Sequence, residues 1–156
     1  QVQHETFATG KTNASLNFNH PVKELVLAGA WGAAGTLAAL DGSSATTMTL
    51  KLNGHERFAP RPLTYFTRTQ VLQHHSAEGG FADRSIGVYS FALKPEEHQP
   101  SGTCNFSRID NARLEHPAQA AGNAAGVQSA GGINVYAVNY NVLRIMSGMG
   151  GLAYSN

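Results

Sequence analysis

Apolar residues alternate with polar ones along several short stretches of the chain, and this period of two limits the possible folds more than any other feature. Residues 48–52 read Met-Thr-Leu-Lys-Leu, which is typical of a strand with one buried face. Residues 16–18 and 25–27 alternate in the same way. Asn53-Gly54 follows the first of these stretches and predicts a tight turn, because both residue types tolerate positive φ.

Two longer stretches, residues 86–93 and 133–142, are apolar on both faces and predict central strands covered on both sides. Pro21 lacks an amide proton and therefore predicts a β-bulge or a sheet edge. No convincing amphipathic helix is visible. Further strands are predicted at 2–7, 106–110 and 143–146. Seven or eight short strands favour an all-β sandwich, jelly roll or barrel over an α/β fold.

The connections between the predicted strands include two long segments, residues 28–47 and 117–132, that are mostly Ala, Gly, Ser and Thr. Loops of this length tend to be functional or stabilised by partners. Neither segment reads as a linker between domains, because the flanking parts are too short to form separate cores. We therefore predict one domain, residues 1–156, and interpret the chain as a fragment or a trimmed product because Gln1 stands where Met would start a protein.

Composition excludes several classes of function. Charged residues make up 13% of the chain, about half of the usual fraction, which suggests that neighbours cover much of the surface. The net charge is +1 and the 11 Lys and Arg residues are scattered, so we expect no binding to nucleic acid. No stretch approaches about 18 uninterrupted apolar residues, so no direct insertion into a membrane is expected.

Motifs that carry chemistry are incomplete. Residues 10–12 read Gly-Lys-Thr, but the glycine that a phosphate-binding loop needs five residues earlier is replaced by Glu5. The adjacent histidines at 74–75 would point to opposite faces of a strand, so no metal site is expected. Cys104 is interpreted as a structural thiol, and Glu96-Glu97 as solvent-facing carboxylates. We predict no catalytic residue, no metal and no cofactor.

Two sequons for N-glycosylation occur, at Asn13 and Asn105. Modification requires passage through a secretory compartment, which nothing else in the sequence indicates. Asn13 lies in a predicted exposed turn and is the better candidate. Asn105 leads into a predicted strand and is interpreted as a structural hydrogen-bonding residue.

Residues 89–111 and 139–156 closely resemble the major capsid proteins of nucleocytoplasmic large DNA viruses, especially those that infect algae, and residues 16–25 and 52–58 add weaker matches in the expected order. The resemblance implies two consecutive jelly rolls per subunit, of which this chain is the second, an eight-stranded sandwich. It further implies a homotrimer that forms a pseudo-hexagonal capsomer of an icosahedral shell around an internal membrane. The implied location is the virion, assembled in the host cytoplasm, with minor capsid proteins as possible further partners.

The matching stretches contain the residues that we expect to serve structure or assembly. Residues 99–102 combine a fixed φ, a hydroxyl that can bond to the backbone and a permissive glycine, as a sharp turn requires. Three glycines in 147–151 suggest close packing against a partner. The full set comprises Pro100, Ser101, Gly102, Asn105, Ser107, Arg108, Asn141, Arg144, Gly148, Gly150 and Gly151.

Two other functions remain open from the residues alone. A carbohydrate-binding jelly roll would need exposed aromatic side chains on a concave face, and Trp31 is the only tryptophan. A metal-dependent enzyme of the cupin type is disfavoured by the histidine spacing. The leading interpretation is a structural protein of a viral capsid without enzymatic activity.

Overall fold

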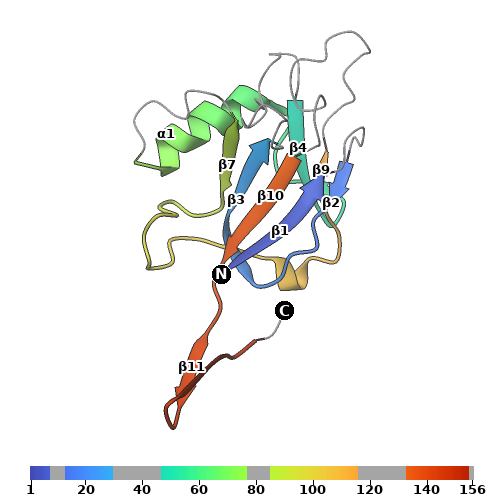
Figure 1. Ribbon diagram of the computed structural model, residues 1–156. Coiled ribbons are helices and arrows are strands. Elements are labelled where there is room, and N and C mark those ends of the chain that lie inside the picture. Colours follow the sequence, from blue (N-terminus) through green and yellow to red (C-terminus); the bar gives the residue numbers. More distant parts are fainter. Residues whose placement is uncertain (8–12, 30–46, 77–84, 116–132, 155–156) are drawn as a thin grey trace, which may run out of the picture.

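The computed structural model describes residues 1–7, 13–29, 47–76, 85–115 and 133–154, which form a sandwich of two antiparallel sheets and a separate hairpin (Figure 1). The first sheet has the order β1 (Val2–Phe7), β10 (Ile133–Asn139), β3 (Pro21–Gly29), β7 (Ile86–Ser90), with β8 (Cys104–Asn105) beside the start of β3. The second has the order β2 (Asn13–Ser15), β9 (Ala112–Glu115), β4 (Thr47–Leu52), β5 (His55–Glu56), with β6 (Arg61–Pro62) also beside β4. The hairpin consists of β11 (Leu143–Met146) and β12 (Met149–Leu152).

This strand order is that of a jelly roll. The first and last strands of the sandwich pair in one sheet, β1 with β10, and the next pair inward, β2 with β9, lies in the other sheet. β3 then pairs with β10, and β4 with β9, so the chain is a long antiparallel ribbon rolled into two layers. β5 and β6 share one position beside β4, which gives four positions in each sheet. The predicted all-β, eight-stranded jelly roll is confirmed.

The core lies between the two sheets and follows the alternation seen in the sequence. In β10 every second side chain is buried and the intervening ones are partly covered, whereas in β3 the alternation is interrupted at the bulge, where Glu24 and Leu25 are both buried. Phe18 and Phe106 meet edge to face at one end of the core, with their ring centroids 5.9 Å apart. The largest fully buried side chains are Phe66, Phe106, Leu25, Leu27, Met48, Leu50, Leu63, Ile133, Val22 and Val71.

Several strand predictions are confirmed. Residues 2–7, 25–27, 48–52 and 143–146 all lie in strands. Of the predicted strand 133–142, residues 133–139 form β10, which lies between β1 and β3, and residues 140–142 are outside it. The bulge predicted from Pro21 is present two residues later. Val138 of β10 pairs with Glu24, and the next residue, Asn139, pairs with Val22, so Lys23 of β3 is left without a partner in the β10 register.

Other predictions need correction. Residues 16–18 are not a strand, although Leu16 and Phe18 are buried in the expected alternation. Residues 106–110 are not a strand either, because Phe106–Arg108 forms a 3-10 turn, η2, that the side chain of Asn105 caps. Of the predicted central strand 86–93, only residues 86–90 form a strand, β7, and it lies at the end of the strand order rather than in the centre of the sheet.

The expectation that the chain lacks a helix was also wrong. A helical segment, η1 (Tyr65–Thr69) and α1 (Gln70–His74), packs against β7 and covers its apolar residues. Its buried positions are Phe66, Thr67, Gln70 and Val71, which is one face of a helix. This apolar face is too short to be recognised in the sequence, and two of its four buried residues, threonine and glutamine, are polar.

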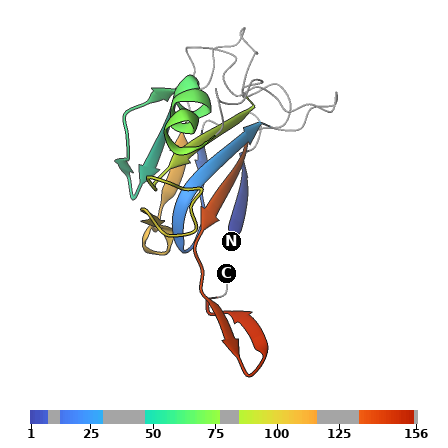
Figure 2. The ribbon, with the colours of Figure 1, turned by 90° about the vertical axis from the view of Figure 1, so that its left-hand side faces the viewer.

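The strands also define two ends of the sandwich. β1 and β3 begin, and β10 finishes, at one end, which we call the base. The hairpin β11–β12 projects from the base beside the N-terminus (Figures 1 and 2). Phe7, Gly29 and Ile133 lie at the opposite end. Residues 10–12, Trp31 and most of both predicted long loops lie outside the described residues.

Candidate assembly surface

The turn at residues 99–102 depends on one glycine and one hydroxyl. Ser101 Oγ accepts a hydrogen bond from the backbone amide of Lys94 at 2.9 Å and lies 3.3 Å from the Lys94 carbonyl. Gly102 has a φ of +145°, and a Cβ at this position would lie 2.7 Å from the Phe91 carbonyl oxygen. Only glycine fits this close approach of two backbone segments.

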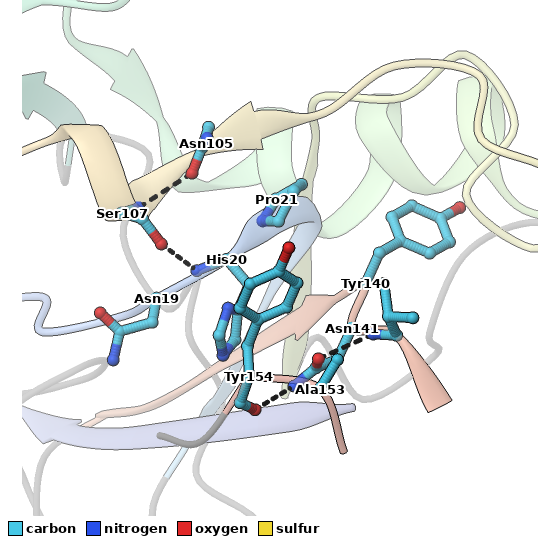
Figure 3. A pocket seen from close by; sticks show the side chains of 10 residues that line it. Asn19, His20, Pro21, Asn105, Ser107, Tyr140, Asn141, Ala153 and Tyr154 are labelled. Carbon is cyan, nitrogen blue, oxygen red and sulfur yellow. Dashed lines mark hydrogen bonds between the residues drawn. The ribbon is translucent and has the colours of Figure 1, made fainter. Parts of the chain in front are cut away.

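Asn105 and Ser107 fasten the next part of the chain to the start of β3. Asn105 Oδ1 accepts a hydrogen bond from the Ser107 amide at 3.1 Å, and Ser107 Oγ accepts one from the His20 amide at 2.8 Å (Figure 3). The Asn105 side chain thus caps the η2 turn, and Ser107 joins that turn to the start of β3. Asn13, the other sequon residue, is exposed as predicted but lies at the start of β2 rather than in a turn.

A cavity of about 760 Å³ opens at the base, between the sandwich and the neck of the hairpin (Figure 3). It brings together Asn105, Ser107 and Asn141, which the sequence placed in two separate motifs. The ring of His20, at a positive φ of 66°, lies 6.3 Å from the ring of Tyr154 across the cavity. The remaining lining residues, which sequence reasoning missed, are Asn19, Pro21, Tyr140, Val142 and Ala153.

Asn141 ties the two ends of the chain to the base. Its Nδ2 donates to Gln1 Oε1 and to the carbonyl oxygen of Tyr154, each at 2.9 Å. Its Oδ1 accepts from the Val142 amide at 2.7 Å, so every polar atom of the amide group is used. The backbones of Gln1 and Asn139 also pair, through hydrogen bonds of 3.0 and 2.9 Å.

The hairpin carries four more of the predicted residues. Ser147 and Gly148 connect the strands and have φ values of 51° and 80°, as a type I′ turn requires. Arg144 pairs with Gly151, and Ile145 with Gly150. These residues lie away from the turn at 99–102 and from the exposed Arg108, so the predicted set is divided between the sandwich and the hairpin (Figure 1).

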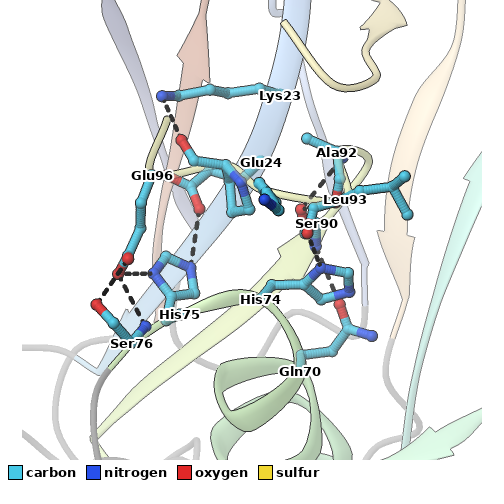
Figure 4. Close-up of polar contacts among 12 residues, drawn as sticks. Lys23, Glu24, Gln70, His74, His75, Ser76, Ser90, Ala92, Leu93 and Glu96 are labelled. Carbon is cyan, nitrogen blue, oxygen red and sulfur yellow. Dashed lines mark hydrogen bonds and ion pairs between the residues drawn. The ribbon is translucent and has the colours of Figure 1, made fainter. Parts of the chain in front are cut away.

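A polar cluster joins α1 to the loop that follows β7 (Figure 4). His75 Nε2 lies 3.0 Å from Glu24 Oε2, and its Nδ1 lies 3.1 Å from Glu96 Oε1. Glu96 also accepts hydrogen bonds from the amide and the hydroxyl of Ser76, at 3.2 and 2.7 Å. The bonds from Ser76, followed by that from His75, hold the pKa of Glu96 below its ordinary value. His74 and His75 therefore lie at the end of α1 and not on a strand, contrary to the prediction.

The described residues offer little for catalysis. Burial raises the pKa of the Cys104 thiol, which disfavours the reactive thiolate. Among the same residues, no three or more His, Cys, Asp or Glu side chains are grouped so as to hold a metal ion. Within this part of the chain there is also no helix of the length and apolarity that crossing a membrane takes.

Residues 1–151 match the family described as large eukaryotic DNA virus major capsid protein. The chain belongs to this family. The major capsid protein of Pyramimonas orientalis virus is 46% identical over an alignment that covers 100% of this chain and 44% of the relative. That of Phaeocystis pouchetii virus is 63% identical over 69% of this chain and 20% of its own length. This chain thus spans less than half of each of these capsid proteins.

Solved structures of capsid proteins share the fold. A chain of the quasi-atomic model of the PBCV-1 virus capsid superposes with a TM-score of 0.69 and 36% identity, over 100% of this chain and 50% of the other. The Faustovirus major capsid protein, at 16% identity and a TM-score of 0.61 over 88% of this chain, shows the same fold. The predicted family resemblance is confirmed.

Proposed function

We propose that this chain is the second of two jelly rolls in a viral major capsid protein, and that it has a mechanical role in a capsid shell. The observation that carries the proposal is the family match over residues 1–151, joined to a complete jelly roll that corresponds to half of the PBCV-1 chain. A second sandwich would account for the remaining length of such a protein.

The assembly that we propose is a homotrimer of the full-length protein, in which six jelly rolls form a pseudo-hexagonal capsomer of the virion. Two features of the chain support extensive contact with neighbours. Its charged fraction is only 13%, and seven large apolar side chains between Val142 and Tyr154 are exposed. Obligate interfaces commonly bury more than about 2,000 Å² and are rich in apolar atoms. We infer assembly in the host cytoplasm, with minor capsid proteins as further partners.

The role is inferred to be structural rather than enzymatic. The polar side chains at the base bond to backbone groups, as Ser107 bonds to His20 and Asn141 to Tyr154, and thereby hold the fold. The half-buried Cys104 thiol is disfavoured as a nucleophile. The comparisons give no support to the carbohydrate-binding alternative, whose key residue, Trp31, lies outside the described residues.

The experiment that tests the proposal compares the full-length parent protein with this chain alone. Mass photometry of the purified parent is expected to give three times the mass of one subunit, and electron microscopy to show hexagonal particles. This chain alone serves as the control for contacts that need the other jelly roll. A parent protein that stays monomeric at micromolar concentration would contradict the proposed capsomer.

A further inference from the structure

The hairpin β11–β12 carries five of the ten large apolar side chains that are exposed among the described residues. It stands off the base of the sandwich, and among the strands that the structure describes β11 and β12 pair only with each other (Figure 2). Leu143, Ile145 and Leu152 are 66%, 68% and 55% exposed. Because a two-stranded hairpin alone is marginal in water, this arrangement indicates that the hairpin is completed by a partner.

The register of the hairpin separates its side chains into two unlike faces. Directly paired residues share a face, so Leu143, Leu152 and Ile145 lie together, with Gly150 opposite Ile145. We call this the aliphatic face. The other face carries Arg144 with Met146, Met149 and Gly151. A guanidinium is costly to bury without a partner, so the aliphatic face is the one suited to tight packing.

The position of Gln1 indicates what covers this face. The Gln1 backbone pairs with Asn139, and its side chain accepts from Asn141, at the point where the hairpin leaves the base. β1 runs from the base toward the opposite end, because Val2 pairs with Val138 and Phe7 with Ile133. Any residues that precede Gln1 in the parent protein therefore reach the sandwich from the side on which the hairpin projects (Figures 1 and 2).

The parent protein has enough length to supply the partner. This chain covers 44% of the Pyramimonas orientalis virus protein and 50% of the PBCV-1 chain, which leaves room for a further domain of similar size. A domain joined at Gln1 is held beside the hairpin at a high effective concentration, in the millimolar range for a short linker. A separate copy has no such advantage.

We propose that the aliphatic face of β11–β12 packs on the part of the parent chain that precedes Gln1, so that the hairpin clamps the two jelly rolls of one subunit together. This rests on the proposed function, which places an upstream jelly roll in the same chain. The clamp is intramolecular, and the type I′ turn at Ser147-Gly148 forms its tip.

Photo-crosslinking in the full-length parent protein tests the clamp. A benzophenone amino acid replaces Ile145 in one variant and Met149, on the opposite face, in a matched control. Each variant is mixed during folding with an equal amount of ¹⁵N-labelled parent, so that crosslinks within a chain differ in mass from those between chains. We expect Ile145 to give crosslinks to peptides that precede Gln1 in the same chain, and Met149 to give few or none.

Any result without intrachain crosslinks from Ile145 overturns the clamp. Crosslinks from Ile145 to a second copy would assign the hairpin to the contact between subunits, and the absence of crosslinks would leave the face without a partner. Trimers without intrachain crosslinks would refute the clamp and leave the capsomer proposal intact. Monomers with intrachain crosslinks would support the clamp and contradict the capsomer proposal.

Hydrogen exchange provides an independent readout. Amides of residues 143–152 are expected to exchange at least about tenfold more slowly in the parent protein than in this chain alone. Ile145→Ser in the parent should remove most of that protection, whereas Arg144→Ser, on the opposite face, should retain it. Equal protection in the two variants would contradict the assignment of the aliphatic face.

Discussion

Gly102 and Gly54 both have positive φ, yet they differ in what surrounds them. A Cβ at Gly102 would lie 2.7 Å from the carbonyl oxygen of Phe91, whereas one at Gly54 would meet nothing within 4 Å. Gly102 therefore combines a backbone requirement with a steric one, and Gly54 has the backbone requirement alone.

We expect Gly102→Ala to lower the free energy of unfolding by about 3 kcal/mol, because either the turn or the segment at Phe91 must shift. Gly54→Ala is the control and should cost about 1 kcal/mol, the usual cost of an L-residue at such a φ. Urea denaturation measures both values. Equal losses in the two variants would show that the close approach to Phe91 has no energetic weight.

Glu96 makes stability depend on pH in a defined direction. Its pKa in the folded chain is lowered from 4.5 by hydrogen bonds from Ser76 and by His75. The stabilisation from the carboxylate is therefore complete above the ordinary pKa and is lost as the pH falls through the lowered, folded value.

Glu96→Gln is expected to lower the urea midpoint at neutral pH and to have progressively less effect as the pH falls below 4.5. Glu97→Gln is a matched control. Among the ion pairs of the described residues, Glu97 takes part in one, with the exposed amine of Lys94 at 3.2 Å, and exposed pairs contribute little to stability. Parallel pH profiles for wild type and Glu96→Gln would contradict the role of this carboxylate.

At the scale of elements, the helical segment η1–α1 is joined to β7 by one buried amide. Gln70 Nε2 donates to the Tyr65 hydroxyl at 2.8 Å, and Gln70 Oε1 accepts from the Ser90 amide at 3.1 Å. The Gln70 side chain thus bonds to a backbone amide at the end of β7 and to a tyrosine hydroxyl in η1 at the same time.

Gln70→Leu should lower the free energy of unfolding by about 2 kcal/mol, because the part-buried Ser90 amide loses its acceptor. Gln73→Leu, an exposed position on the same helix, should change it by less than about 0.5 kcal/mol. The comparison uses urea denaturation at one pH. Equal small effects would mean that the helix docks through apolar contacts alone.

At the scale of the whole molecule, the two sheets share one core and should unfold together. Leu27 of β3 and Leu50 of β4 lie in opposite sheets and are each 1% exposed. Each belongs to the single cluster of buried residues between the sheets. A domain of this size with one core is expected to unfold in one transition.

Leu27→Ala and Leu50→Ala are each expected to cost about 2–5 kcal/mol and to shift the same transition, whether followed by circular dichroism or by intrinsic fluorescence. Leu93→Ala, at an exposed position, is the control and should have little effect. Two separate transitions, one for each variant, would contradict a single folding unit.

Much of the fold was determined by the sequence alone. The alternation at 25–27 and 48–52 identifies strands because side chains along a strand point to opposite faces, a property that depends on adjacent residues only. Asn53-Gly54 likewise specifies its own turn, with φ values of 51° and 82°. The family match of residues 89–111 and 139–156 rests on the same kind of local information.

The site was decided by the tertiary structure. Asn141 and Gln1 are 140 residues apart in sequence, and Ser107 and His20 are 87 apart, so no local pattern indicates that they meet. The 3-10 turn at Phe106–Arg108 replaces a predicted strand because a side chain caps it. The exposure of the aliphatic face is also a tertiary property. Apolar side chains recur at every second position both in β3 and in β11, but the opposite sheet buries those of β3, whereas β11 lies beyond the end of β10 and its side chains are exposed.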